Sequence, residues 1–396
     1  MTAGVALAHD YATQRGGAER VALLLARAFP GAPLYTTLYD PAATFPEFAD
    51  LDVRTGPLDR VGVLRHHHRL ALPFLAPSVS AQRVDADVLL ASSTGWAHGY
   101  RGARRTVVYC HAPARWLYQR DRYLSGEAGA RTSDRARRAV AGTALGLLAP
   151  PLRAWDRRAA GRADRYLANS TVTARAVQAA YGIEAEVVPP PPALLPDDGA
   201  SLPVDGVAPG FLLCVARLLP YKNVDAVIGA VRELGGRRLV VVGDGPDRAR
   251  LEGLARAAGT VPSAGGGAAG SPDGAGEPRV RLLGRVDDGT LRWLYAHAAA
   301  LVAASYEDYG LSPLEAGAFG APAVVLRDGG YLDTVVGGVT GTFFDRPDPV
   351  EIARAIEEAA RTTWDDQALA DHVARFGTGR FLDRIRTIVE HERHDG

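Results

Sequence analysis

The sequence has few cysteines and no long hydrophobic run. Its two cysteines, Cys110 and Cys214, lie in separate apolar stretches, TVVYC and FLLCVA. A disulfide framework is therefore not indicated, and a reducing compartment fits the cysteine content. The N-terminus has no charged region followed by a long apolar segment, so we expect no signal peptide. The longest apolar run, at 141–150, is about half of a membrane span. We expect a cytoplasmic protein, at most peripherally attached to the inner face of the plasma membrane.

The sequence also lacks an excess of either charge and a dinucleotide-binding fingerprint. Lys+Arg and Asp+Glu both number 45, which argues against a dedicated nucleic-acid-binding protein. RGGAER (15–20) and VVGDGPDR (241–248) follow apolar runs, but neither has the G-x-G-x-x-G spacing. The missing fingerprint disfavours an NAD-dependent dehydrogenase.

Short apolar segments alternate with amphipathic helical segments along most of the 396 residues. The candidate strands lie at 4–9, 87–93, 105–110, 165–170, 211–216, 238–243, 280–284 and 300–305. Strands that are apolar on both faces and separated by helices are typical of parallel sheets covered by helices. The length suits two domains of about 150–200 residues each. We therefore predict an α/β protein with two doubly wound, Rossmann-like domains that face each other across a cleft. Ligands in such sheets bind at the carboxyl ends of the strands.

Changes in composition mark the boundaries between the predicted segments. VVPPPPALLP (187–196) holds four consecutive prolines, which neither a helix nor a central strand accommodates. The predicted segments are an N-terminal domain at 1–190, a stiff linker at 191–207, a ligand-binding domain at 208–375 and a C-terminal helix at 376–396 that would pack back on the N-terminal domain. Within the second domain, the Gly-, Ala-, Ser- and Pro-rich stretch at 259–278 is predicted to be a disordered loop without a role in the chemistry.

In the N-terminal half, a glycine pair and a histidine are candidate ligand contacts. Gly16 and Gly17 follow the first strand and open a helix, where backbone amides can approach a diphosphate closely. The alternative is a plain tight turn. His111 follows the strand at 105–110 and would face the expected cleft as a polar contact or a base. The alternative for His111 is a structural histidine whose hydrogen bonds are satisfied internally.

In the C-terminal half, two cations follow the strand at 211–216. Arg217 and Lys222 lie where this strand ends and a helix begins, in the stretch CVARLLPYKNVD. Two cations at such a place can bind a phosphate leaving group. The alternative is solvated surface charge.

The stretch SYEDYGLSPLEAGAFGAP (305–322) carries two glutamates, Glu307 and Glu315. We predict that Gly310 makes a turn and that Ser312 is the helix N-cap, so that Glu315 falls at the third helical position as part of a capping box. Because both glutamates leave the same strand–turn–helix corner, they do not flank one glycosidic bond as hydrolase carboxylates do. We interpret them as acceptors for hydroxyls of one ligand whose phosphates bind the helix amides. A ligand with both hydroxyls and phosphates is a nucleotide sugar.

These motifs, in this order and at this spacing, resemble the retaining family-4 glycosyltransferases of the GT-B fold. EDYGLSPLE followed by AGAFGAPAVV resembles the Glu-x(7)-Glu signature of that family. HDYATQRGGAER, YCHAPARWLY, LRAWDRRAAGRADRYLANS, VARLLPYKNVD and LLGRV resemble the branch that includes bacterial mannosyltransferases of polysaccharide synthesis. The resemblance runs from residue 9 to about residue 345, is interrupted at 259–278 and is weaker at 119–150.

The resemblance implies a role for each residue in the glycine, histidine and cation motifs. Gly16 and Gly17 would line the donor diphosphate and the acceptor side. His111 would contact the donor sugar and support charge at its anomeric carbon. Arg217 and Lys222 would stabilise the departing diphosphate.

The resemblance also implies that the two glutamates form a ligand clamp. Glu307 would bind a hydroxyl of the donor sugar, and Glu315 would hold the ribose hydroxyls. The residues implied to lie close to the sugar and the phosphate are Tyr309, Gly310, Leu311 and Ser312.

The implied reaction is transfer of a hexose with retention at the anomeric carbon, by a route without a covalent nucleophile in which the leaving phosphate accepts the acceptor's proton. The branch favours mannose from GDP-mannose, a substrate; no cofactor is expected. Metal should be dispensable, because Arg217 and Lys222 take its place, and we interpret the D-x-D letters at 85–87 as surface residues. Closure of the two domains should exclude water from the reaction.

The implied acceptor is a glycan or a saccharide carried on a lipid diphosphate in cell-surface polysaccharide synthesis. The segment 131–165 holds nine arginines and three aspartates, and its arginines can bind anionic lipid headgroups. A solvated helical face is the alternative. Three other functions stay open: a UDP-sugar-dependent transferase, a sugar-nucleotide epimerase that needs no acceptor, and a non-catalytic sugar-nucleotide binding module. The last should lack the cation pair or the clamp, and this chain keeps both.

Overall fold

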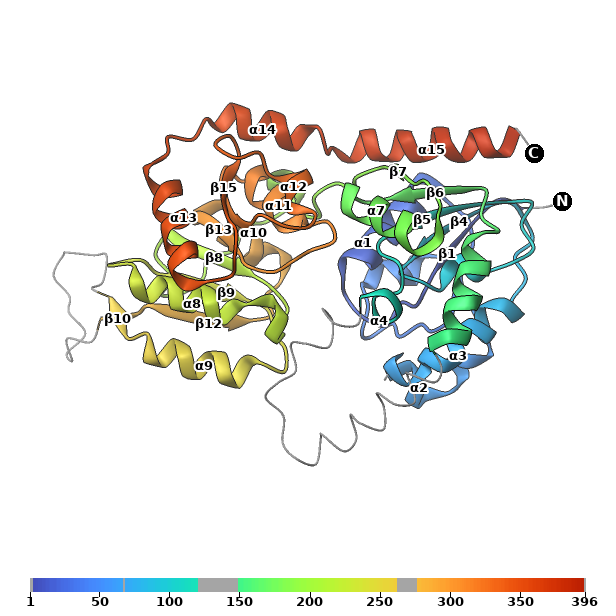
Figure 1. Ribbon diagram of the computed structural model, residues 1–396, viewed down its shortest axis with the longest axis horizontal. Helices are drawn as coiled ribbons and strands as arrows, with labels where there is room; N and C mark the ends of the chain where they lie inside the picture. The colour runs from blue at the N-terminus through green and yellow to red at the C-terminus, as the bar shows by residue number, and fades with distance from the viewer. Residues whose placement is uncertain (1–2, 67, 120–148, 262–275, 395–396) are drawn as a thin grey trace. The chain divides into compact units, whose positions relative to one another are not determined.

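The computed structural model describes residues 3–66, 68–119, 149–261 and 276–394. The chain forms two compact units. Unit 1 comprises Met1–Pro190 and Thr378–Gly396, and unit 2 comprises Pro191–Gly377. Each unit has its own parallel sheet (Figure 1). Each also has its own hydrophobic core.

Unit 1 is built on a seven-stranded parallel sheet with the strand order β3-β2-β1-β4-β5-β6-β7. Its strands are β1 (Ala3–His9), β2 (Leu34–Thr36), β3 (Val53–Thr55), β4 (Ala86–Ser93), β5 (Arg105–Cys110), β6 (Arg165–Ala168) and β7 (Glu186–Val187). The central strands are short apolar runs that are buried on both faces, which is why they pair in parallel under helices. Val5 pairs with Val88, and Val88 pairs with Arg105.

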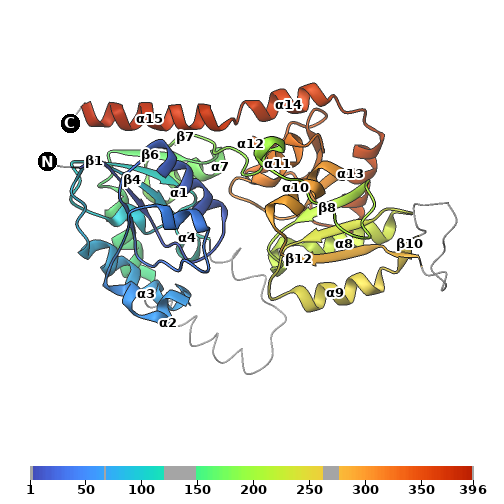
Figure 2. The same cartoon turned by 180° about the vertical axis from the view of Figure 1, so that it is seen from behind.

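Helices cover both faces of this sheet (Figures 1 and 2). The helices of unit 1 are α1 (Gly17–Ala28), α2 (Gly62–His66), α3 (His68–Ala81), α4 (Arg115–Tyr118), a helix at 149–160, α7 (Thr171–Tyr181) and α15 (Thr378–His394). One cluster of buried residues joins α1 and α15 to the sheet, and another joins α3, the helix at 149–160 and α7 to it. The described part of the unit also contains the short 3₁₀ helices η1 (Pro46–Asp50), η2 (Pro57–Arg60) and η3 (Ala97–Gly99).

The C-terminal helix α15 is part of unit 1 although unit 2 separates it in sequence from the rest of that unit. It contacts α1, β4 and β5 through a stripe of buried side chains at helical spacing, including Phe381, Ile385 and Ile388. Ion pairs add to this contact, because Glu392 lies 3.3 Å from Arg105.

Unit 2 is built on a six-stranded parallel sheet with the order β12-β9-β8-β13-β14-β15. Its strands are β8 (Phe211–Val215), β9 (Leu239–Val242), β12 (Val280–Gly284), β13 (Ala298–Ala303), β14 (Ala323–Leu326) and β15 (Gly341–Phe344). Its helices are α8 (Val224–Glu233), α9 (Arg248–Ala257), α10 (Asp288–His297), α11 (Leu311–Ala318), α12 (Tyr331–Thr334), α13 (Pro349–Arg361) and α14 (Asp366–Ala374), with the 3₁₀ helices η4 (Pro196–Asp198) and η5 (Pro220–Lys222).

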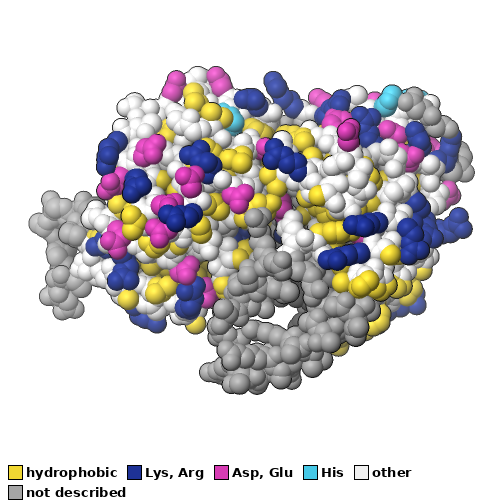
Figure 3. Space-filling model, viewed as in Figure 1, with side chains coloured by type: hydrophobic (Ala, Val, Ile, Leu, Met, Phe, Trp, Pro, Cys, Tyr) yellow, Lys and Arg dark blue, Asp and Glu magenta, His cyan; other side chains and the backbone are white. Residues whose placement is uncertain are grey.

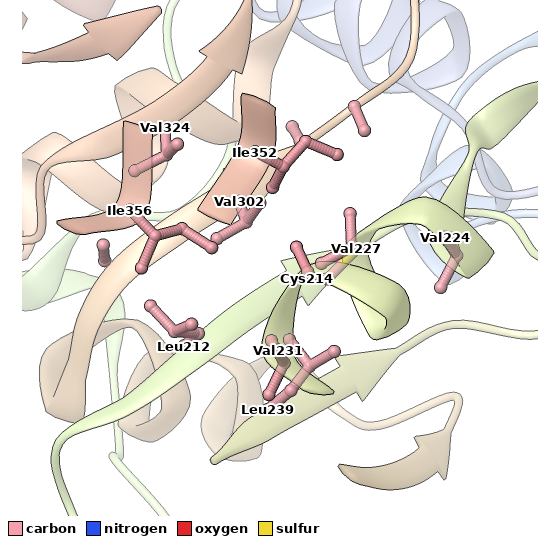
Figure 4. Packing of buried hydrophobic residues seen from close by; sticks show 14 of the residues in the cluster. Leu212, Cys214, Val224, Val227, Val231, Leu239, Val302, Val324, Ile352 and Ile356 are labelled. Atoms are coloured by element: carbon pink, nitrogen blue, oxygen red, sulfur yellow. The ribbon is translucent and has the colours of Figure 1, made fainter. Parts of the chain in front are cut away.

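Acidic and basic side chains are interspersed over the visible face of unit 2 (Figure 3). Apolar side chains fill its interior. In the main core, Cys214 of β8 and Val302 of β13 belong to the same buried cluster as Val227 of α8 and Ile352 of α13 (Figure 4). A second cluster on the other face of the sheet joins β8 and β9 to α10 and α11.

All strands predicted from the sequence are present, with small shifts at their ends. The prediction of a disordered loop at 259–278 is wrong at both ends of that stretch. Thr260–Val261 forms β10, which pairs with β11 (Glu277–Pro278) in an antiparallel ribbon. Burial of the Val261 side chain and an ion pair between Glu277 and Arg238 stabilise this ribbon. Residues 262–275 of the predicted loop lie outside the described residues.

The stretch set apart as a linker at 191–207 is grouped with unit 2. Leu194 is buried in the cluster that contains Phe211 and Tyr295, and Val204 packs against the same cluster. Among the described residues, no helix is both long enough and apolar enough to cross a membrane.

Candidate ligand-binding site

Lys222 and Glu307 meet at the carboxyl ends of two neighbouring strands of unit 2. Lys222 follows β8 and Glu307 follows β13, and these strands pair in parallel. The ammonium group of Lys222 donates a hydrogen bond to Oε1 of Glu307. The same carboxylate oxygen accepts a second bond, 2.9 Å long, from the hydroxyl of Ser305. The side chain of Lys222 is 11% exposed and that of Glu307 is 30% exposed, so the pair is partly open to solvent.

Asn223 holds the turn that carries Lys222. Among the described residues it is the one non-glycine residue with a positive φ, at 54°. Its side-chain amide donates a 2.8 Å hydrogen bond to the carbonyl of Ala304, at the end of β13. Asparagine tolerates the left-handed region better than most residues do, which explains its place here. This bond ties the turn after β8 to the strand end that presents Glu307.

Arg217 lies in a loop that two glycines hold in place. A Cβ atom at Gly243 would lie 1.9 Å from the carbonyl oxygen of Ala216, and one at Gly245 would lie 2.2 Å from that of Leu218. The G-x-G letters of VVGDGPDR therefore serve the close packing of this turn against the Arg217 loop. The Arg217 side chain is exposed, and its guanidinium makes no ion pair with any acid in the described part of the chain.

The helix that follows Glu307 begins earlier than the sequence predicts. α11 starts at Leu311 with Gly310 as its N-cap, and no side chain caps it. Ser312 is therefore the second residue of the helix instead of the N-cap, Glu315 is the fifth residue instead of the third, and the predicted capping box is wrong. The reason is the left-handed conformation of Gly310, at φ 84°, which lets the chain enter the helix directly.

The loop that precedes α12 packs tightly on this corner. A Cβ atom at Gly310 would lie 2.6 Å from the ring of Tyr331, and the backbone amide of Gly330 donates a 2.8 Å bond to the carbonyl of Glu307. Tyr309 is buried, 5% exposed, between these segments. The first backbone amides of α11, at Leu311 and Ser312, have no intrahelical partner and point out of the helix end, as in any helix.

Glu315 is held by two other parts of unit 2. Glu315 is buried, with 8% of the residue exposed. Oε2 accepts a 2.7 Å hydrogen bond from the hydroxyl of Tyr295 on α10, and Oε1 accepts a 3.3 Å bond from the amide of Ala193. Sequence reasoning did not identify Tyr295, because helical periodicity predicts that an aromatic residue is buried but not which carboxylate its hydroxyl reaches.

In unit 1, the structure places His111 directly after β5 in a chain of buried polar groups. Its Nε2 lies 2.9 Å from the hydroxyl of Ser92, which lies 3.0 Å from Nδ1 of His9. Burial, together with the nearby positive charges of His9 and Arg115, lowers the pKa of His111 to about 3. Burial also lowers the pKa of His9, against the effect of the negative Asp10. Both imidazoles are therefore neutral near pH 7, and the Ser92 hydroxyl, with its single proton, couples their tautomers.

Gly16 and Gly17 open α1, as predicted, with Gly16 as its N-cap and no side-chain cap. The first turn of the helix also holds Glu19, which is 1% exposed. A Cβ atom at Gly16 would lie 2.6 Å from Oε2 of Glu19. The helix end that would receive a diphosphate therefore already has a carboxylate beside it.

Within the described residues, no group of three or more His, Cys, Asp and Glu side chains is arranged to hold a metal ion. Of the D-x-D letters at 85–87, Asp87 lies in β4 and is 3.6 Å from Arg393 of α15.

Two family models match the chain, one that ends within the proline segment and one that follows it. The model described as Glycosyltransferase Family 4 matches residues 15–191, and the model described as Glycosyl transferases group 1 matches residues 209–362.

Among curated proteins, the D-inositol 3-phosphate glycosyltransferase of Acidothermus cellulolyticus is 31% identical over 214 residues, 49% of this chain and 45% of the relative. The protein of the same description from Mycobacterium tuberculosis is 29% identical over 258 residues, 60% of this chain and 50% of the relative. The chain thus matches about half the length of these curated relatives.

Solved structures match nearly the whole chain at lower identity. Anabaena HepE in complex with UDP has a TM-score of 0.66 at 18% identity, covering 98% of this chain and 100% of the other. Sucrose-phosphate synthase from Thermosynechococcus elongatus also has a TM-score of 0.66 at 18% identity, over 99% of this chain and 100% of the other. At these identities the likeness is one of fold. From the two family models and the shared architecture we conclude that this chain belongs to the family-4 glycosyltransferases, a retaining family, and has their GT-B fold.

Proposed function

We propose that the chain is a retaining, metal-independent hexosyltransferase that moves a sugar from a nucleotide sugar to a glycan or a lipid-linked saccharide. The observation that carries this proposal is the Lys222–Glu307 pair at the carboxyl ends of β8 and β13. A cation and a hydroxyl acceptor lie side by side there, directly before the N-terminus of α11. A sugar diphosphate needs both kinds of contact at adjacent positions.

In the proposed reaction, the bond between the anomeric carbon and the diphosphate oxygen breaks, and its electron pair stays on the phosphate. Lys222, Arg217 and the amides at the start of α11 stabilise the developing negative charge. Glu307 accepts a hydrogen bond from a hydroxyl of the donor sugar. The acceptor hydroxyl attacks the face that the leaving group vacates, and the leaving phosphate takes its proton. No side chain acts as a covalent nucleophile.

For the residues of unit 1, the proposal keeps the roles that the family resemblance implies. His111 contacts the donor sugar as a neutral imidazole, which its lowered pKa supports. Gly16 and Gly17 line the diphosphate and the acceptor side. The carboxylate of the buried Glu19 beside Gly16 opposes an anionic ligand at this helix end, because like charges repel.

We propose GDP-mannose as the donor, on the resemblance to bacterial mannosyltransferases. A UDP-hexose is the second candidate, supported by the similar structures of Anabaena HepE with UDP and with UDP-glucose. The two are separated by incubating the purified chain in excess EDTA with GDP-mannose or UDP-glucose and a lipid-linked or free glycan acceptor, and measuring release of the nucleoside diphosphate. If the nucleoside diphosphate is released from only one of the two sugar nucleotides, and only when the acceptor is present, that sugar nucleotide is the donor. A changed sugar nucleotide in the absence of acceptor would instead indicate an epimerase.

We also propose peripheral contact with an anionic membrane, as an acceptor carried on a lipid would require. Arg135, Arg137 and Arg138 of the basic segment lie outside the described residues. In its described part, Arg158 and Arg162 are exposed. Partial burial, and after it the positive charges of Arg101 and Arg158, lower the pKa of Arg162. Lys and Arg side chains also gather at the right-hand edge of unit 1 in Figure 3.

The test compares binding of the chain to phosphatidylglycerol vesicles before and after Arg158 and Arg162 are replaced by Gln. The control replaces two exposed arginines of unit 2, Arg232 and Arg256, so that the net charge changes equally. Weaker vesicle binding for the first variant alone supports the proposal, and equal binding of both variants counts against it.

A further inference from the structure

Tyr295 lies against the carboxylate of Glu315 and is held there by packing. Its side chain is 0% exposed. Its ring stacks on Phe319, with 5.8 Å between the ring centroids and 14° between their planes. Its buried neighbours in the same cluster include Leu294 and Ala316. Because the ring has little freedom, its hydroxyl can donate in one direction, toward Oε2 of Glu315 at 2.7 Å.

The second oxygen of Glu315 is held by the backbone. Oε1 accepts a bond from the amide of Ala193, which directly follows the four prolines and belongs to unit 2. The carboxylate is thus bound from two elements, α10 and the segment at 191–195. A carboxylate has two oxygens that each accept more than one hydrogen bond, so it can bind protein donors and two adjacent ribose hydroxyls together.

Tyr295 keeps its proton over the working pH range. Burial raises the pKa of Tyr295 well above its usual value, and the negative charge of Glu315 adds to this effect. The hydroxyl is therefore always a donor to the carboxylate. A hydrogen bond to a charged group is stronger than one between neutral groups, which suits it to orient the carboxylate.

We propose that Tyr295 is a positioning residue that orients Glu315 toward the ribose hydroxyls and so sets the preference of the site for ribonucleotides over deoxyribonucleotides. This inference rests on the proposed function and on the role that the family resemblance implies for Glu315, which is to hold the ribose hydroxyls of the nucleotide sugar. Without the Tyr295 hydroxyl, the Glu315 carboxylate can rotate about its terminal bond, and the hydrogen bonds to the ribose weaken. Contacts to the diphosphate, which Lys222 makes from η5, do not change.

The experiment compares the affinity of the wild-type chain and of Tyr295→Phe for two ligand pairs, GDP with 2′,3′-dideoxy-GDP and UDP with 2′,3′-dideoxy-UDP. Titration calorimetry gives the four dissociation constants. We expect Tyr295→Phe to weaken binding of the preferred ribonucleotide about tenfold, the scale of one hydrogen bond to a charged group, and to leave the dideoxy compound nearly unchanged. The ratio of the two affinities is measured on the same folded protein, so a loss of stability does not alter it.

Val231→Ala is the control, because it removes buried side-chain atoms from the other core cluster of unit 2, which contains neither Tyr295 nor Phe319. It should lower the melting temperature and leave the ribose preference intact. An equal loss of both nucleotides in Tyr295→Phe would overturn the inference. A ribose preference that is lost in Glu315→Ala but kept in Tyr295→Phe would also overturn the inference. Failure of the wild type to bind any of the four nucleotides would instead overturn the proposed function.

Discussion

Lys222 donates a hydrogen bond to Glu307 across the ends of two paired strands. The carboxylate neutralises the cation that the proposed reaction needs for its leaving group. A nucleoside diphosphate alone must therefore compete with Glu307 for Lys222, whereas a sugar nucleotide also supplies a hydroxyl to Glu307.

This relationship predicts opposite effects of Glu307→Gln on two ligands. The substitution removes a negative charge next to the phosphate position, so the free nucleoside diphosphate should bind several-fold more tightly. Transfer of the sugar should fall by about 10²-fold or more, because an interaction with the reacting sugar is lost. Calorimetry and the turnover assay measure the two effects, and weaker binding of the free diphosphate would contradict the assignment of Lys222 to the phosphate.

Lys222 is the only lysine in the sequence, which makes it a specific chemical reporter. Its side chain is 11% exposed, so acetic anhydride can reach it slowly. We expect a nucleoside diphosphate to slow acetylation of Lys222, because the ammonium group is then held by the phosphates. Mass spectrometry of the modified peptide measures this rate. The α-amino group of the same chain is the internal control, and protection of both amines alike would show that the effect is not local to the site.

Gly310 and Gly320 form a matched pair that separates crowding from backbone strain. Both have a positive φ, 84° and 81°. An added Cβ atom would lie 2.6 Å from the Tyr331 ring at Gly310 and would meet nothing within 4 Å at Gly320. Gly320→Ala should cost about 1 kcal/mol from strain alone. Gly310→Ala should cost about 1–3 kcal/mol more, because the ring must move. Urea unfolding measures both values, and equal losses would mean that the Tyr331 ring yields without cost.

The histidines at the strand ends of unit 1 predict a dependence of stability on pH. The pKa of His111 is about 3 in the folded chain and near 6.5 in the unfolded chain. Above pH 6.5 the imidazole is neutral in both the folded and the unfolded chain, so it does not reduce the free energy of unfolding. As the pH falls from 6.5 toward 3, the unfolded chain takes up a proton that the folded chain does not, and stability falls by up to about 1.4 kcal/mol per pH unit. His9 acts in the same direction, because its pKa is also lowered.

Unfolding by urea at pH 7 and pH 5 measures this loss, and His111→Gln should make it smaller. The ring resonances of His111 should not titrate between pH 5 and 8. A midpoint near 6.5 for His111 in the folded chain would contradict its buried, neutral state.

The sequence predicts the fold well because its apolar runs are unambiguous. The runs at 87–93 and 211–216 become β4 and β8, and the helices between them cover two parallel sheets. The predicted start of α11 is wrong because propensity favours Ser312 as the N-cap, whereas the packing of Tyr331 on Gly310 selects the glycine. Local rules do not include such a contact between residues distant in sequence.

For the candidate site, the sequence predicts residues but not partners. The sequence places Lys222 and Glu307 after two different strands, and the structure shows that these strands are neighbours and that a hydrogen bond joins the two side chains. The contacts of Tyr295 and Ala193 with Glu315 join segments about 20 and 122 residues away from it, and no local pattern predicts them.

The most direct test of the central claim is calorimetric titration of the metal-free chain with GDP, UDP and ADP, alongside Lys222→Ala. The account predicts that GDP binds in the presence of EDTA and that Lys222→Ala loses this binding. Preference for UDP with the same dependence on Lys222 would keep the mechanism and replace the mannose donor. Binding of none of the three nucleotides, or binding that Lys222→Ala leaves unchanged, would contradict the account.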